Sequence, residues 1–155
     1  MTLQNLLGVS LEAIVPDRAQ VARMLSAAER NLADAAIAGL SAETRFEVCY
    51  KAIMQLAMLA LYANGYRTLT SRPGHHQTAI QSLTLTVGIA PEQVRVLDAL
   101  RKQRNRADYS GDLVPEATAA ECLSSATALG GQVREWLRAN KPDLAGVAEQ
   151  GSEKL

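Results

Sequence analysis

Residues 41–65 read SAETRFEVCYKAIMQLAMLALYANG, and this stretch decides the fold class. Ser41 is a favourable helix N-cap and Asn64-Gly65 is a favourable stop, so the pattern predicts a helix over residues 42–63. From residue 52 to residue 63 every side chain except Gln55 is apolar, and the run is shorter than the roughly twenty residues that a bilayer span requires. A helix that is apolar on nearly all sides packs against neighbours on most sides. We therefore expect this helix at the centre of a bundle or as one wall of a subunit interface.

The same reading, extended in both directions, predicts four further helices: residues 17–38, 75–87, from Pro91 onward, and from Pro115-Glu116 to about residue 139. Residues 65–74, rich in Gly, Thr, Ser and Pro, are expected to form a loop. Short connections force sequential helices to run up and down. The predicted fold class is all-α, an antiparallel up-and-down bundle of four to five helices. One domain over residues 10–139 is expected, followed by a disordered C-terminal tail over residues 140–155.

Composition excludes several functions. The sixteen basic and sixteen acidic residues cancel, so no overall field attracts nucleic acid or an anionic membrane, and any phosphate binding has to be local. Cys49 and Cys122 lack CxxC spacing and are expected to be reduced core residues. The adjacent pair His75-His76 cannot aim both rings at one ion, so no metal site and no cofactor are predicted. We expect a cytoplasmic protein without a membrane partner.

A basic segment interrupts the apolar pattern. Residues 101–106 read RKQRNR and are followed by Ala107-Asp108-Tyr109. At helical spacing, one face carries Arg101, Arg104, Asn105 and Asp108. The face is either an ordinary solvated stripe with weak ion pairs, or a site where guanidinium and amide groups meet a phosphate or a second subunit.

A family resemblance supports the second interpretation. The motif RNRADY at residues 104–109, the apolar helix from Tyr50 and the stretch GHHQTAI at residues 74–80 together resemble the HEPN domain. The resemblance covers residues 17–138 and implies a HEPN-like helical bundle that forms a homodimer. In ribonuclease members of that family an Arg, a following polar residue and a His four to six positions later form the active site. Carried over by position, Arg104 is the Arg and Asn105 is the polar residue, whereas Tyr109 occupies the place of the His.

The tyrosine changes the expected chemistry. A phenol with a pKa near 10 is a poor base at pH 7, whereas an imidazole titrates near neutrality. The Asp108-Tyr109 pair is similar to that of members that do not cleave RNA. The resemblance therefore implies a homodimeric binding or assembly protein, with Arg101, Arg104, Asn105, Asp108 and Tyr109 binding a phosphate or a partner.

The resemblance also implies possible partners and leaves two alternatives. The partner would be a nucleotidyltransferase of a toxin-antitoxin or stress and defence system, and RNA or a nucleotide is the possible ligand. One alternative is a metal-independent ribonuclease toxin with a composite dimer-interface site. Its candidate catalytic residues are Arg104, Asn105 and Tyr109, with His75 as a possible assistant. The other alternative is a purely structural bundle. On their helix, His75 and His76 are expected to serve packing or helix-start hydrogen bonding.

Overall fold

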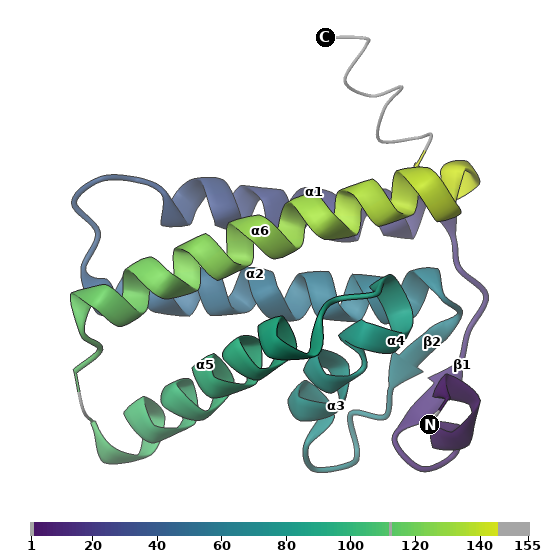
Figure 1. Cartoon of the computed structure of the whole chain (residues 1–155), viewed down its shortest axis with the longest axis horizontal. Coiled ribbons are helices and arrows are strands. Elements are labelled where there is room, and N and C mark those ends of the chain that lie inside the picture. The colour runs from purple at the N-terminus through teal and green to yellow at the C-terminus, as the bar shows by residue number, and fades with distance from the viewer. Residues whose placement is uncertain (1, 112, 146–155) are drawn as a thin grey trace, which may run out of the picture.

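The computed structural model describes residues 2–111 and 113–145, with the side chains of residues 108–110 left out. Figure 1 shows a mostly helical molecule, so the all-α class is confirmed, with a small two-stranded ribbon added to it. In chain order the elements are η1 (Leu3–Leu6), β1 (Leu11–Ala13), α1 (Arg18–Ala35), α2 (Ala42–Ala63), β2 (Tyr66–Thr68), α3 (His75–Gln81), α4 (Leu83–Val87), α5 (Pro91–Ser110) and α6 (Glu116–Asn140).

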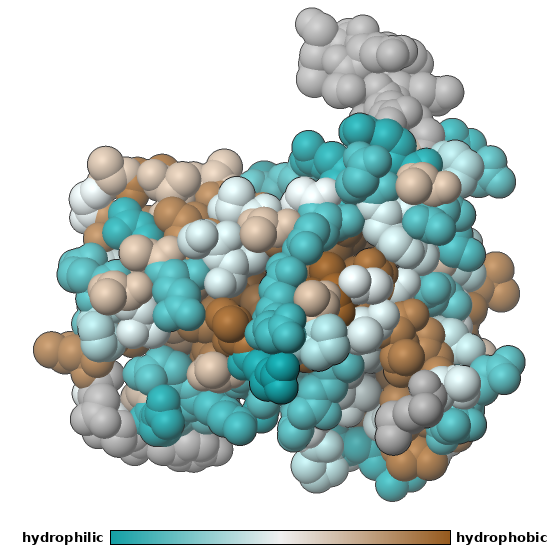
Figure 2. All heavy atoms as spheres, viewed as in Figure 1, coloured by the Kyte–Doolittle hydropathy of each residue, from teal (hydrophilic) through white to brown (hydrophobic). Residues whose placement is uncertain are grey.

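Helix α2 is the centre of the fold, as the apolar run predicts. It packs along its length against α1 and α6, while α3, α4 and α5 lie on its other side (Figure 1). By length and composition α2 is also apolar enough to cross a membrane, but 67% of its most apolar window is buried inside the fold. That burial is typical of a core helix. On the face drawn in Figure 2, hydrophobic residues show only in patches between hydrophilic ones.

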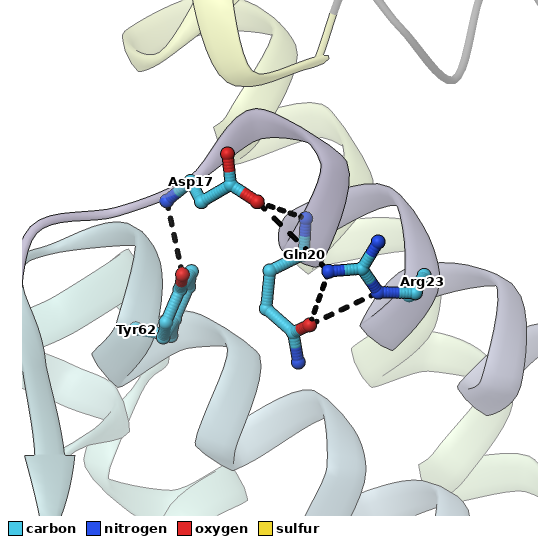
Figure 3. Close-up of polar contacts among 4 residues, drawn as sticks. All are labelled: Asp17, Gln20, Arg23 and Tyr62. Atoms are coloured by element: carbon cyan, nitrogen blue, oxygen red, sulfur yellow. Dashed lines mark hydrogen bonds and ion pairs between the residues drawn. The ribbon is translucent and has the colours of Figure 1, made fainter.

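Side chains cap the two long N-terminal helices. The Ser41 hydroxyl accepts a hydrogen bond from the Thr44 amide at 3.2 Å, so α2 begins where the sequence predicts. At the start of α1, the Asp17 carboxylate accepts from the Gln20 amide at 3.1 Å, and the Asp17 amide donates to the Tyr62 hydroxyl at 2.9 Å. Figure 3 shows how these contacts connect the first turn of α1 to the end of α2.

Helix α1 ends at Ala35 rather than at the predicted residue 38. The Arg45 guanidinium, which comes from α2, donates to the Ala35 carbonyl at 3.0 Å and to the Ile37 carbonyl at 2.9 Å. These tertiary contacts satisfy carbonyls at the helix end that would otherwise have no partner within the helix.

The predicted loop at residues 65–74 contains a strand. Its first residues form β2, which pairs antiparallel with β1 in the register Leu11–Thr68, Glu12–Arg67 and Ala13–Tyr66. Each strand has three residues, too few to show an alternating pattern, so only the long-range pairing reveals them. The Arg67 side chain forms an ion pair with Glu12 across this ribbon.

The predicted helix over residues 75–87 is two helices, α3 and α4. They are separated at Ser82, whose buried hydroxyl donates to the Ala79 carbonyl at 2.8 Å. A serine side chain that bonds nearby backbone competes with regular helical hydrogen bonds. The single-helix prediction was therefore wrong at this point.

Residues on both sides of the expected domain 10–139 contact the core. Leu3 and Leu6 pack against the core at the N-terminal end. Beyond α6, residues 142–145 form another helical turn, and Leu144 packs against the core. Residues 142–145, within the expected tail 140–155, are thus helical, and residues 146–155 lie outside the described residues.

The two cysteines lie in the core, as expected. Cys49 of α2 and Cys122 of α6 are free thiols with no exposed surface. The hydrogen bond between them lowers the pKa of Cys49 and, together with burial, raises the pKa of Cys122.

Candidate functional site

The basic segment forms the C-terminal half of α5. Pro91 is at the favourable first helical position, and Gly111 ends the helix with a φ of 72°. This single helix places Arg101 and Arg104 on its inner side and leaves Asn105 exposed. The backbone of Asp108 and Tyr109 is in the helix, but their side chains lie outside the described residues.

Arg101 is engaged within its own helix. Its Nε lies 2.8 Å from Oδ1 of Asp98, and the two side chains are only 14% and 16% exposed. Lys102 approaches the other oxygen of the same carboxylate at 3.7 Å. Because this pair is shielded from solvent, removing Asp98 would leave the charge of Arg101 without its partner. Arg101 therefore helps to hold α5 and contributes positive charge to the site without turning toward it.

Among the predicted residues whose side chains the structure describes, Arg104 is the one that lies in a groove. Its guanidinium carbon lies 5.1 Å from the centroid of the Tyr50 ring, a cation–π arrangement. Its Nε lies 3.8 Å from a carboxylate oxygen of Glu47, on the same helix as Tyr50. The Arg104 side chain is 30% exposed and Glu47 is 51% exposed. The guanidinium is thus positioned by an aromatic face while part of it stays accessible.

An imidazole lies next to this arginine. Nδ1 of His76, at the start of α3, lies 3.1 Å from the Tyr50 hydroxyl. The ring of His75 contacts the His76 ring edge-on, with centroids 4.6 Å apart. Tyr50 therefore contacts both Arg104 and His76, and it joins three helices at one point.

Burial and nearby positive charge set the protonation of this cluster. Burial lowers the pKa of His76, and the charges of His75, Arg104 and Arg101 lower it further. Burial raises the pKa of Tyr50 to about 12, against the opposing effect of the two arginines. At pH 7 the site therefore combines a neutral imidazole, a protonated phenol and a guanidinium cation.

The cluster opens into a groove of about 680 Å³ between α1 and the α3–α5 side of the molecule, with α2 beneath it. Arg104, His76, Tyr50 and Glu47 lie among its lining residues. The other lining residues come from α1 and α2: Gln20, Arg23, Met24, Ala27, Asn31, Val48, Lys51, Met54, Gln55 and Met58. The groove is therefore apolar along part of its length and cationic at its rim.

Several residues of this site were not predicted from the sequence. His76 was expected to serve packing or helix-start hydrogen bonding, and Tyr50, Glu47 and Lys51 were not predicted as site residues. One signal was available: Glu47, Lys51, Met54 and Met58 recur at i, i+4, i+7 and i+11, a stripe distinct from the core stripe of the same helix. The approach of α3 to this stripe has no local sequence signal.

Within residues 2–111 and 113–145, no three His, Cys, Asp or Glu side chains lie close enough together to hold a metal ion. No protein-family model, curated protein sequence or solved structure matches this chain.

Proposed function

We propose that this chain is a HEPN-like homodimeric binding or assembly protein that holds an anionic group at Arg104 without turnover. The anionic group is a phosphate of a nucleotide or RNA, or a carboxylate of a protein partner. The observation that carries the proposal is the position of Arg104, stacked on Tyr50 and partly exposed at the end of a groove of about 680 Å³.

The chemistry of the cluster suits an anion. A guanidinium presents several donors in one plane and binds phosphate or carboxylate through two of them. Of the lining residues that the structure describes, Glu47 is the one carboxylate, and its 3.8 Å contact with Arg104 is long and half exposed. Such a pair is worth about 1 kcal/mol or less. A doubly charged phosphate therefore competes with it readily, and the protonated phenol of Tyr50 and the imidazole of His76 add hydrogen-bonding groups nearby.

The resemblance to the HEPN domain supplies the biological part of the proposal. It supports a homodimer in the cytoplasm and a nucleotidyltransferase partner in a toxin-antitoxin or stress and defence system. Asn105, exposed on the outer side of α5, is available to a second subunit or partner in such an assembly.

Replacing Arg104 with glutamine is expected to weaken pyrophosphate binding at least tenfold, because charge-assisted hydrogen bonds contribute about 1.5–3 kcal/mol. Isothermal titration calorimetry at low salt measures the affinity. Arg106→Gln is the matched control, because Arg106 is exposed on the same helix and donates to Gln103 at 2.8 Å. Equal binding by the two variants, or no binding by the unchanged protein, would contradict the proposed anion site.

The position of His76 favours the ribonuclease as a second candidate function. A neutral imidazole lies in the same groove as the arginine and supplies the proton carrier that the motif lacks at Tyr109. In this mechanism the ribose 2′-oxygen loses its proton and attacks phosphorus, and the bond to the 5′-oxygen breaks. The products are a 2′,3′-cyclic phosphate and a 5′-hydroxyl that has gained a proton.

If the chain is a ribonuclease, His76→Gln and Arg104→Gln are each expected to reduce cleavage by about a hundredfold, within the range for a general acid–base group. Arg106→Gln should cleave like the unchanged protein. Gel analysis of a labelled single-stranded RNA gives the rates. RNA left intact by the unchanged protein would reject this second function and agree with the first.

A further inference from the structure

Two helices that run antiparallel present matching stripes to the groove. On α1 the stripe is Gln20, Met24, Ala27 and Asn31, and on α2 it is Glu47, Lys51, Met54 and Met58. Both have the spacing i, i+4, i+7 and i+11, so each covers three helical turns, about 16 Å at 1.5 Å per residue. A pair of packed helices with such stripes forms the kind of furrow into which the ridge of another helix fits.

Part of this furrow is apolar and adaptable. Met54 is buried at 7% exposure, while Met24 and Met58 are half-buried and so reach the open side of the groove. Methionine side chains are unbranched and flexible, which lets them adjust to the side chains of a bound partner. Ala27 also lines the groove from α1, and its small side chain leaves room for a large one from a partner.

The furrow also carries positive charge. Arg23 lies near one end, where Gln20 receives two hydrogen bonds from its guanidinium at 2.8 and 3.0 Å (Figure 3). Lys51 and Arg104 also line the groove, and Arg104 lies beside Glu47. Among the described residues of the lining, Arg23, Lys51 and Arg104 are permanent cations and Glu47 is a carboxylate, and Asp17 lies 3.9 Å from Arg23 just outside the lining. The groove is therefore more cationic than the chain as a whole, whose formal net charge is zero.

Two amides add polar specificity. Asn31 Nδ2 donates to Gln55 Oε1 at 2.7 Å, which joins α1 to α2 beside the methionines. Both side chains are partly buried, and each amide has further hydrogen-bonding capacity. A partner that covers this position has to match it with polar groups.

We propose that the groove that lies over α2, between α1 and the α3–α5 side of the molecule, binds an acidic amphipathic helix of a partner protein. The apolar side chains of that helix, three turns long, lie on Met24, Met54 and Met58, and its carboxylates face Arg23, Lys51 and Arg104. This is the helix-in-groove mode of peptide recognition. The inference rests on the partner-binding part of the proposed function and names the chemistry of the partner.

The test uses the full-length protein and two synthetic peptides of about 18 residues, long enough for the helical state to be sampled. Both carry leucines at i, i+4, i+7 and i+11 on an alanine-rich background; one has glutamates beside the leucines and the other has lysines. Fluorescence anisotropy is expected to show saturable binding of the glutamate peptide, at least about tenfold tighter than the lysine peptide, because each tenfold difference requires only 1.4 kcal/mol.

Groove variants locate the binding. Met58→Glu places a carboxylate on the half-buried apolar surface and should weaken binding of the glutamate peptide at least about tenfold. The Met58→Leu variant should bind this peptide as tightly as the unchanged protein does. Lys51→Glu changes an exposed residue and should reduce the affinity for the glutamate peptide by the same factor without altering the packing. Equal affinity for the two peptides, no binding of either, or Met58→Glu and Lys51→Glu variants that bind like the unchanged protein would each overturn the inference.

Two further outcomes separate this inference from the proposed function. If light scattering shows that Met58→Glu converts a dimer into a monomer, the groove is filled by a second copy of the chain and the inference is wrong. If the unchanged protein binds pyrophosphate but neither peptide, the anion site at Arg104 remains and the helix partner is rejected.

Discussion

Replacing Phe46 with alanine is expected to lower the free energy of unfolding by about 3–5 kcal/mol. Phe46 is the only phenylalanine of the chain, has no exposed surface and belongs to the central helix α2. Its removal leaves a cavity among helices that cannot close around it completely. Since a domain of this size is stable by about 5–15 kcal/mol, the loss is a large fraction of the total. Urea or guanidinium denaturation followed by circular dichroism measures it.

Val48 provides the control on the same helix. It is half-buried and faces the groove, so Val48→Ala removes two methyl groups from a surface that is already partly wet. A loss of about 1 kcal/mol or less is expected, because a fully buried methylene is worth about 0.8 kcal/mol. If Phe46→Ala and Val48→Ala lower the free energy of unfolding equally, Phe46 is not a residue of the packed core.

Adjacent glycines in α6 should respond to substitution with opposite signs. A Cβ atom added at Gly130 would lie 3.0 Å from Leu32 Cδ1 and 3.8 Å from Leu56 Cδ1, because α6 approaches α1 and α2 closely there. Gly130→Val forces these helices apart, and overpacking of this kind costs about 1–3 kcal/mol. The expected result is a lower unfolding midpoint in chemical or thermal denaturation.

At Gly131 a Cβ atom meets nothing within 4 Å, and the residue is exposed in the same helix. Gly131→Ala is therefore expected to stabilise the protein by about 0.5–1 kcal/mol, because alanine restricts the unfolded chain and favours the helix. A Gly130→Val variant as stable as Gly131→Ala would show that α6 does not pack closely against α1 at this point.

Helix α2 shows how much local chemistry predicts. Its apolar run, its Ser41 cap and its Asn64-Gly65 stop act within a few residues of one another, and the bounds 42–63 agree with the prediction. The predicted start of α5 at Pro91 is correct for the same reason. In contrast, the carbonyl at the end of α1 is bonded by Arg45 of α2, and the ribbon depends on the pairing of β1 with β2, far apart in the chain.

The residues of the candidate site are likewise predictable from the sequence only in part. The sequence singles out Arg104 because its charge and its helical position are local properties. The HEPN resemblance remains an interpretation of that motif. No local property places Asn105 outside while Arg104 turns inward, because that depends on which side of α5 meets α2 and α3.

The sequence alone determined the helical class, the central helix and the basic segment, because periodicity, caps and charge act over one or two helical turns. Only the tertiary structure decided that Tyr50 meets both Arg104 and His76, and that α1 and α2 leave a methionine-lined groove between them and α5. These arrangements arise from packing between segments separated by tens of residues, and no single stretch of sequence encodes the distance between them.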